Sequence, residues 1–437
     1  MDDSHPLSDL IVGHLSSFFA YPVRPNYCTL TPISKPRTRK DLSKWYYRFD
    51  VAPRLTDPSG VTRTITVVHN NINGTSSIGS LARWAVREAL ERNWRVIAVC
   101  RDLDPGLIND VDHRPLRVPP RLHLWQYSVA RPTVRAALRG VRADVTMVHQ
   151  PQLAAIADVW QVHYLSRTAR NARLRPPPGW RSRVVDTQAA GVARLEDHYL
   201  HRLPARTRVL FCSSGLRADF TAQYGAHPNS AVLHNPALLA MRPATDRPNR
   251  RAELTDDHPG PVVGFLGGND ARKGAQLVTE AVARAPEVFL LHAGLPPLAD
   301  HDPRLRGRTR GLGRLADVTE LLDCVDALLI PSRFDPFPLV VAEAAARGIP
   351  VIVTDQVGSA PLVRRTGAGL PWPGLDGLGA ALRTLTADRA GFAQGSQRLL
   401  AELDPHRQAE QLFAEFEQIL DRKSTRSKAT RATRAGE

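Results

Sequence analysis

The chain has 437 residues, of which 43% are apolar and 23% charged, and its formal net charge is +15. This length favours two or three domains, and the near-average apolar content excludes a disordered or collagen-like chain. No apolar stretch in the sequence approaches the roughly 18 residues that a membrane-spanning helix needs.

Cysteine usage and the N-terminal sequence bear on the cellular compartment. Cys28, Cys100, Cys212 and Cys324 lie far apart, with no CxxC spacing and no histidine pairing. We therefore expect reduced thiols, no structural zinc and a cytoplasmic protein. The first ten residues, MDDSHPLSDL, are acidic where a signal peptide would be basic, which argues against secretion.

Arginine supplies most of the positive charge. Only six of the 58 basic residues are lysines, and Lys273 is the sole lysine between Trp45 and Arg422. Such a bias indicates GC-rich coding, and residues 421–437 alone contribute +4 through six basic and two acidic residues. Basicity is therefore weak evidence for nucleic-acid binding, which is kept as an alternative.

Residues 1–62 precede the first predicted strand and form an N-terminal extension. Within it, apolar side chains recur at helical spacing from Leu10 to Phe19, which predicts an amphipathic helix. We expect its apolar face to pack on the body of the protein. A homodimer contact or a peripheral membrane contact at the cytoplasmic face is the alternative.

From Thr64 onward, predicted strands and helices alternate in two series. Strands are predicted at 65–70, 95–100, 144–150, 158–163 and 208–214, and again at 261–268, 288–294, 327–332 and 350–354. Helices are predicted at 79–92, 189–202, 274–284, 315–323, 338–347, 377–385 and 406–420. Such alternation predicts an α/β protein with two Rossmann-like domains, each a parallel sheet covered by helices.

The predicted domains follow from a polar, proline- and arginine-rich stretch at 243–261. The N-terminal domain spans 63–240 and is joined by the helix at about 406–420, and the C-terminal domain spans 241–405. Residues 421–437 are expected to be a basic, disordered tail. A ligand should bind at the carboxyl ends of the strands, in the cleft between the domains.

The most informative segment is PSRFDPFPLVVAEAAARGIPVIVTD, at 331–355. A helix is predicted to begin at Pro338, because proline is favoured at a first helical position. The free amides of Leu339 and Val340 would then face the cleft, where a helix N-terminus attracts phosphate.

Two carboxylates flank this predicted anion site. Asp335 precedes the helix and Glu343 lies inside it, so both suit hydroxyl groups on either side of a diphosphate. The alternative is that Asp335 caps a turn and Glu343 is a solvated helix residue.

A second segment, FLGGNDARKGAQLVTEA at 265–281, carries glycines and cations. Gly267 and Gly268 allow close approach of the backbone to a ligand, and Arg272 and Lys273 lie where a diphosphate needs positive charge. A lysine kept in an arginine-favouring chain strengthens this interpretation. Exposed residues at a helix start are the alternative.

Together these segments resemble glycosyltransferase family 4, whose members have the GT-B fold of two Rossmann-like domains facing each other across a cleft. The family's E-x7-E pattern matches Asp335 and Glu343, and its G-R-L-x-x-x-K-G segment matches Gly267 and Lys273. The resemblance implies a retaining glycosyltransferase that uses a nucleotide-diphosphate sugar such as a UDP or GDP sugar. It implies no further cofactor and no metal site.

The resemblance also implies residue roles. Glu343 would hold the nucleotide ribose, Asp335 the donor sugar, and Lys273 with Arg272 the diphosphate. The remaining donor-binding residues would be Gly267, Gly268, Phe337, Pro338, Leu339 and Val340. Gly268 replaces the family's arginine and Pro338 its glycine, so donor contacts there differ and the identity of the sugar stays open.

In the N-terminal half the resemblance is looser. The loop NINGTSSIGS at 71–80 lies where the family has a glycine pair against the donor phosphates, so Gly74, Ser76 and Ser77 would serve there. VWQVHYLSR resembles the segment that places a histidine, here His163, near the reacting sugar. A core or loop histidine is the alternative for His163, and the favoured interpretation for His149.

Six arginines without an acid occupy 167–183, after His163. We interpret them as a solvated surface loop, with binding of an anionic acceptor as the alternative. We expect the acceptor to be a small soluble metabolite or natural product. The alternatives are a lipid-linked or glycan acceptor at a membrane, a GT-B epimerase or phosphorylase, and a binding protein that has lost catalysis.

Overall fold

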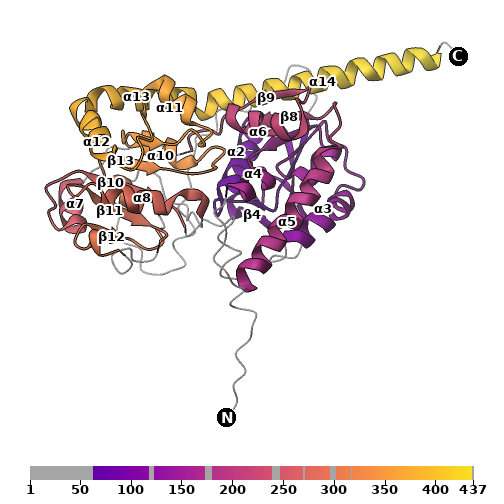
Figure 1. The fold of residues 1–437 in the computed structure, drawn as a ribbon. Coiled ribbons are helices and arrows are strands. Elements are labelled where there is room, and N and C mark those ends of the chain that lie inside the picture. The colour runs from indigo at the N-terminus through magenta and orange to yellow at the C-terminus, as the bar shows by residue number, and fades with distance from the viewer. Residues whose placement is uncertain are drawn as a thin grey trace, which may run out of the picture.

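The computed structural model describes residues 63–117, 123–172, 180–238, 247–268, 271–295, 302–315 and 317–435. They form two α/β lobes, each built on a parallel sheet (Figure 1). The predicted fold class is confirmed. The amphipathic helix expected in residues 1–62 lies outside the described residues.

The N-terminal sheet has seven parallel strands in the order β5-β3-β1-β6-β7-β8-β9. In chain order they are β1 (Thr64–Val68), β3 (Arg95–Cys100), β5 (Asp112–Pro115), β6 (Val145–Val148), β7 (Val159–Val162), β8 (Arg208–Phe211) and β9 (Ser230–Val232). The central strands are buried on both faces, which explains their continuous apolar runs. A further pair, β2 (Asn71–Ile72) and β4 (Asp102–Leu103), lies outside this sheet.

The C-terminal sheet has six parallel strands in the order β12-β11-β10-β13-β14-β15. They are β10 (Val262–Leu266), β11 (Phe289–Ala293), β12 (Thr309–Gly311), β13 (Ala327–Ile330), β14 (Val351–Val353) and β15 (Gly369–Pro371). Because β10 pairs directly with β13, the loops that follow these two strands lie side by side.

Helices connect the strands of both sheets. Those of the N-terminal lobe are α2 (Ser77–Glu91), α3 (His123–Ala137), α4 (Ser166–Asn171), α5 (Trp180–Leu200) and α6 (Ser214–Tyr224). Those of the C-terminal lobe are α7 (Arg247–Thr255), α8 (Ala275–Ala283), α9 (Thr319–Leu322), α10 (Leu339–Ala346), α11 (Ala360–Thr366), α12 (Leu378–Ala387) and α13 (Arg389–Glu402).

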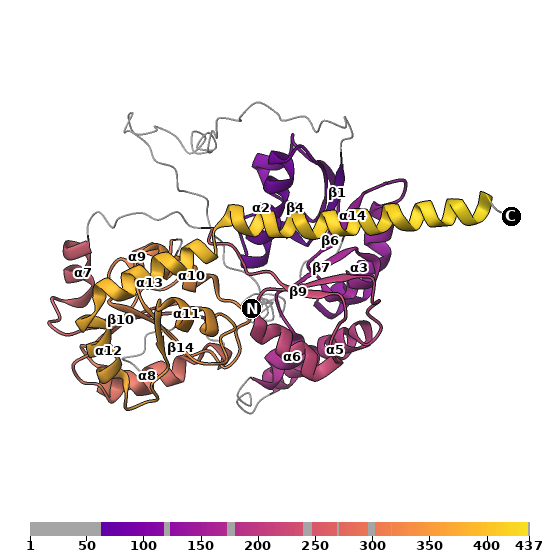
Figure 2. The ribbon, with the colours of Figure 1, turned by 90° about the horizontal axis from the view of Figure 1, so that it is seen from above.

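The last helix, α14 (Pro405–Ala435), runs back across the N-terminal lobe (Figures 1 and 2). Its apolar side chains share one stripe and join the core of that lobe: Leu412, Phe413, Phe416 and Ile419. The ring of Trp94 lies 5.5 Å from that of Phe413. Arg208 donates to both carboxylate oxygens of Glu415, at 2.6 and 2.7 Å.

The structure differs from the sequence-based expectations in several places, and helices α3, α4, α6, α11 and α13 lie where no helix was predicted. The short strands β5, β9, β12 and β15 were not predicted, because three or four residues carry too little periodicity. Helix α7 occupies part of the stretch expected to be a linker. The tail expected to be disordered from residue 421 continues α14 to Ala435, since its alanines and basic residues are compatible with helix.

No helix among the described residues combines the length and the apolarity needed to cross a bilayer. Cys100, Cys212 and Cys324 are buried and form no disulfide among the described residues.

The packing of α14 predicts a stability effect. Phe416 is fully buried, so Phe416→Ala should destabilise the protein by about 3–5 kcal/mol and lower the Tm measured by scanning calorimetry. Gln411→Ala, on the exposed face of the same helix, should change stability by less than about 0.5 kcal/mol. Equal Tm values for the two variants would contradict the packing described here.

Candidate functional site

Lys273 is positioned by the turn between β10 and α8. It ends a single helical turn, Ala271–Lys273, and Gly274 follows with a φ of +77°. A Cβ at Gly274 would lie 2.1 Å from the carbonyl oxygen of Pro331, so the close approach requires glycine. This contact places Lys273 against the loop that follows β13.

Lys273 and Asp335 form an ion pair at the carboxyl edge of the C-terminal sheet. Lys273 Nζ lies 2.6 Å from Asp335 Oδ2, and the side chains are 25% and 11% exposed. The two loops are also joined by their backbones, because the amide of Arg333 donates to the carbonyl of Arg272 at 2.6 Å. Two residues that lie 62 positions apart therefore share one small, mostly buried site.

The predicted helix N-terminus follows Asp335. Helix α10 begins at Leu339, and Pro338 is its N-cap rather than its first residue as we expected. Pro338 has a ψ of 122°, which is extended backbone, so the helical conformation begins one residue later. The amides of Leu339 and Val340 belong to the first turn, where helix amides have no partner within the helix.

Glu343 lies one turn inside α10 and is only partly exposed. Burial, and to a smaller extent the nearby Asp317 carboxylate, raises the pKa of its carboxyl to about 7. Glu343 is thus poised between its neutral and charged forms near neutral pH.

Arg272 is buried and reaches the N-terminal lobe. Its guanidinium carbon lies 5.4 Å from the centre of the Tyr164 ring. The same ring packs edge-on against Phe334, with centroids 5.8 Å apart. Tyr164 therefore contacts the loops after both β10 and β13, and cation–π attraction holds Arg272 towards the cleft.

Phe337 and its neighbours also pack across the lobes. The ring of Phe337 stacks on His234, with centroids 5.5 Å apart. A Cβ at Gly358 would lie 1.9 Å from the carbonyl oxygen of Pro336 and 2.3 Å from Ser213 Oγ. The loop that carries Asp335 is therefore held against the start of α6.

Three histidines cluster at the ends of neighbouring strands of the N-terminal sheet. His149 Nδ1 lies 3.0 Å from His163 Nε2, and the rings of His69 and His149 meet edge-on at 5.6 Å. Burial lowers the pKa of His69 to about 4 and that of His163 to about 3, and it also lowers the pKa of His149. All three rings are therefore neutral at pH 7, and in the closest pair the N–H of one ring donates a hydrogen bond to the bare nitrogen of the other.

The histidine cluster leaves ring nitrogens open. His163 Nδ1 and His149 Nε2 are buried and have no hydrogen-bond partner in the part of the chain that the structure describes. No group of three His, Cys, Asp or Glu residues among the described residues has the geometry of a metal site.

The predicted loop at Gly74, Ser76 and Ser77 lies at the start of α2. Ser76 is the N-cap of this helix, and its hydroxyl accepts a hydrogen bond from the amide of Gly79 at 3.1 Å. Ser77 is exposed and Gly74 is buried. Ser76 therefore has a structural role in the helix start, whatever else the loop binds.

Two of the arginines that follow His163 have acidic partners from α5. Arg167 pairs with Asp197, and Arg170 pairs with Asp186. These carboxylates lie 30 and 16 residues further along the chain, so the fold compensates the charge of these two arginines. The interpretation as a surface segment fits these two residues better than binding of an anion.

Sequence reasoning missed several residues of this region. Tyr164, Phe334 and His69 were not singled out, although Tyr164 directly follows His163 and His69 directly follows β1. Position at the end of a strand was the available signal for His69. Nothing in the sequence indicates that Tyr164 reaches the opposite lobe.

Comparison with known proteins agrees with this geometry. The family described as "Glycosyl transferases group 1" matches residues 260–401, which include the Lys273–Asp335 pair and Glu343. The chain is 27% identical to the glycogen synthase of Mycobacterium tuberculosis over 321 residues, covering 64% of this chain and 72% of that protein. It is 26% identical to the GDP-mannose-dependent alpha-mannosyltransferase of Mycolicibacterium smegmatis, covering 72% and 84%.

A solved structure extends the similarity to both lobes. HepE of Anabaena, in complex with UDP and glucose, superposes with a TM-score of 0.56 at 16% identity, over 82% of this chain and 100% of that one. The chain is a glycosyltransferase with the GT-B fold. Membership of glycosyltransferase family 4 is consistent with these matches.

The raised pKa of Glu343 makes a testable prediction for this glycosyltransferase. The folded protein binds the Glu343 proton more tightly than the unfolded chain, whose carboxyl has a pKa near 4.5. The contribution of Glu343 to the free energy of unfolding is therefore fully present below about pH 4.5, and it is lost as the pH rises through 7. Glu343→Gln mimics the neutral acid, so its Tm should exceed that of the wild type by an amount that grows between pH 4.5 and 7 and then levels off.

The matched control is Glu91→Gln, which changes an exposed glutamate on α2. Its Tm difference from the wild type should not change with pH over this range. A Tm difference for Glu343→Gln that is constant from pH 4.5 to 8 would show that the group titrates normally.

Proposed function

We propose that this glycosyltransferase is a retaining enzyme that transfers a sugar from a nucleotide-diphosphate sugar to a small soluble acceptor. The observation that carries the proposal is the Lys273–Asp335 ion pair, which lies directly before the N-terminus of α10. A diphosphate is bound by cations and by free backbone amides, and the hydroxyl groups of a sugar can donate to a carboxylate. This edge of the sheet provides all three kinds of group.

The proposed donor class is supported by the named relatives. The mannosyltransferase of Mycolicibacterium smegmatis is GDP-mannose-dependent, and HepE was solved with UDP and glucose. Glu343 is proposed to hold the nucleotide ribose, Asp335 the sugar hydroxyls, and Gly267, Gly268 and Phe337 to border the donor. In the N-terminal lobe, Gly74, Ser76 and Ser77 are proposed to approach the diphosphate.

In the proposed reaction, the acceptor oxygen bonds to the anomeric carbon as the bond from that carbon to the diphosphate breaks. The new bond forms on the same face of the sugar, and the acceptor proton passes to the departing phosphate oxygen. Arg272, Lys273 and the first-turn amides of α10 stabilise the charge that develops on the diphosphate. The neutral His163 lines the reacting face and offers an open ring nitrogen to a sugar hydroxyl.

We also propose that the reaction needs no further cofactor or metal, that the domains span 63–240 and 241–405, and that the protein is cytoplasmic. We further propose that the N-terminal extension makes a peripheral membrane contact or a homodimer contact.

The donor site predicts nucleotide binding that depends on Lys273. Among UDP, GDP, ADP and TDP, at least one should raise the Tm in a thermal-shift assay. Lys273→Ala should weaken that nucleotide about 10- to 100-fold, because a charge-assisted hydrogen bond contributes about 1.5–3 kcal/mol.

The matched control is Lys423→Ala, which removes a lysine on α14 that pairs with Asp158 in the N-terminal lobe. It should keep the full nucleotide response. If none of the four nucleotides raises the Tm, or if both lysine variants respond like the wild type, the proposed donor site is wrong.

Retention predicts the configuration of the product. With water as a slow acceptor, the sugar first released from the donor should keep the anomeric configuration that it had in the nucleotide sugar. Proton NMR at early times, before the free sugar equilibrates, measures this configuration. An inverted sugar would contradict a retaining mechanism, and a free sugar phosphate would indicate a phosphorylase.

A further inference from the structure

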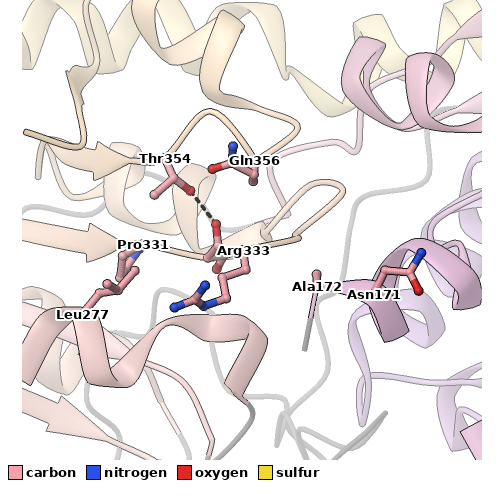
Figure 3. A pocket seen from close by; sticks show the side chains of 8 residues that line it. Asn171, Ala172, Leu277, Pro331, Arg333, Thr354 and Gln356 are labelled. Carbon is pink, nitrogen blue, oxygen red and sulfur yellow. Dashed lines mark hydrogen bonds between the residues drawn. The ribbon is translucent and has the colours of Figure 1, made fainter. Parts of the chain in front are cut away.

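A cavity of about 450 Å³ lies between the two lobes, beside the loop that carries Asp335 (Figure 3). Asn171 from the end of α4 faces residues of the C-terminal lobe across it. Those residues are Ser332 and Arg333 after β13, and Thr354 and Gln356 after β14. The volume is in the usual range of small-molecule sites.

The lining of this cavity carries one positive charge and no acidic side chain. No carboxylate of the described residues lies within ion-pair distance of Arg333, and its Nε is buried without a hydrogen-bond partner. Arg167 and Arg170 on α4, by contrast, are paired with Asp197 and Asp186. Among the described residues, Arg333 is therefore a cation without a carboxylate partner.

Ser332 provides a second, independent indication of a ligand. It is 1% exposed, and its hydroxyl borders the cavity without a hydrogen-bond partner in the part of the chain that the structure describes. The hydroxyl of Thr354 donates to the Ser332 carbonyl, which fixes the backbone of this loop (Figure 3). A buried hydroxyl without a partner is unfavourable, and a ligand that accepts its hydrogen bond would relieve the cost.

The neutral side chains add further donors. The side chains of Asn171 and Gln356 line the cavity from opposite lobes, and each carries an amide with N–H donors. A guanidinium, a hydroxyl and two amides form a donor-rich set, which suits an oxyanion.

The cavity is next to the proposed donor site. The backbone amide of Arg333 is bonded to the carbonyl of Arg272, and Asp335 follows two residues later. We propose that this cavity is a binding site for a phosphate or similar oxyanion carried by the acceptor. The inference rests on the proposed function, because it takes the cleft as the place where the acceptor meets the donor.

The test uses the full-length protein saturated with the nucleotide that raises its Tm, so that the diphosphate site is filled. Inorganic phosphate is then titrated, and its binding is followed by ³¹P NMR. We expect saturable binding that Arg333→Gln weakens about tenfold or more. Arg333→Lys should keep a larger part of the affinity, because it retains the charge.

Two further variants distinguish binding in the cavity from an effect of net charge and from a folding defect. Arg389→Gln removes an exposed arginine elsewhere in the same lobe and should leave phosphate binding unchanged. Ser332→Ala removes only the unpartnered hydroxyl. It should weaken phosphate binding several-fold while the Tm of the empty protein stays the same or rises.

Phosphate that does not bind saturably, or that binds Arg333→Gln as tightly as the wild type, would overturn the inference and leave the donor site intact. If no nucleotide binds, the proposed function fails, and the same titration without nucleotide still tests the cavity. Equal loss in Arg389→Gln would assign the effect to overall charge and would also overturn the inference.

Discussion

A parallel strand that is buried on both faces exposes polar side chains to a ligand mainly at its ends, and this constraint determines where chemistry can occur in the protein. In the C-terminal sheet β10 and β13 are neighbours, so the loops after them bring Lys273 and Asp335 together. In the N-terminal sheet β1, β6 and β7 are neighbours, and a histidine follows each of them. Both groups lie at the carboxyl ends of their strands, where α/β proteins bind ligands.

The charges at the candidate site are partly compensated by one another. Lys273 and Asp335 compensate each other, burial keeps the histidines neutral, and Glu343 is held near the point of half-ionisation. A diphosphate that enters this region would meet Arg272, Lys273 and a helix N-terminus with little competing negative charge apart from Asp335. Under the proposed function, Lys273 and Asp335 would exchange each other for groups of the donor when it binds.

Much of this arrangement could be predicted from the sequence, because the deciding signals are local. Apolar runs located the main strands, and the motif residues Lys273 and Asp335 were found in the loops after them, with Glu343 in the helix that follows. Contacts between distant segments could not be predicted. The pairing of Arg167 with Asp197 and the reach of Tyr164 to Arg272 depend on how helices and lobes pack, and no local pattern encodes either.

The sequence pattern also did not predict the length of α14 or the exact start of α10. Both depend on backbone conformation at a helix end, where propensities differ by only about 1 kcal/mol or less for most residues.

The central claim is that Lys273 binds the donor diphosphate, and the scarcity of lysine allows a direct test. Protein labelled with ¹³C at the lysine ε-carbon contains six labelled side chains, so its NMR spectrum is simple enough to assign by substitution. Addition of a nucleotide diphosphate that stabilises the protein should shift the signal that is absent from Lys273→Arg, as the ammonium exchanges Asp335 for phosphate oxygens. If that signal does not move at a nucleotide concentration that saturates the thermal shift, Lys273 does not contact the diphosphate and the account is wrong.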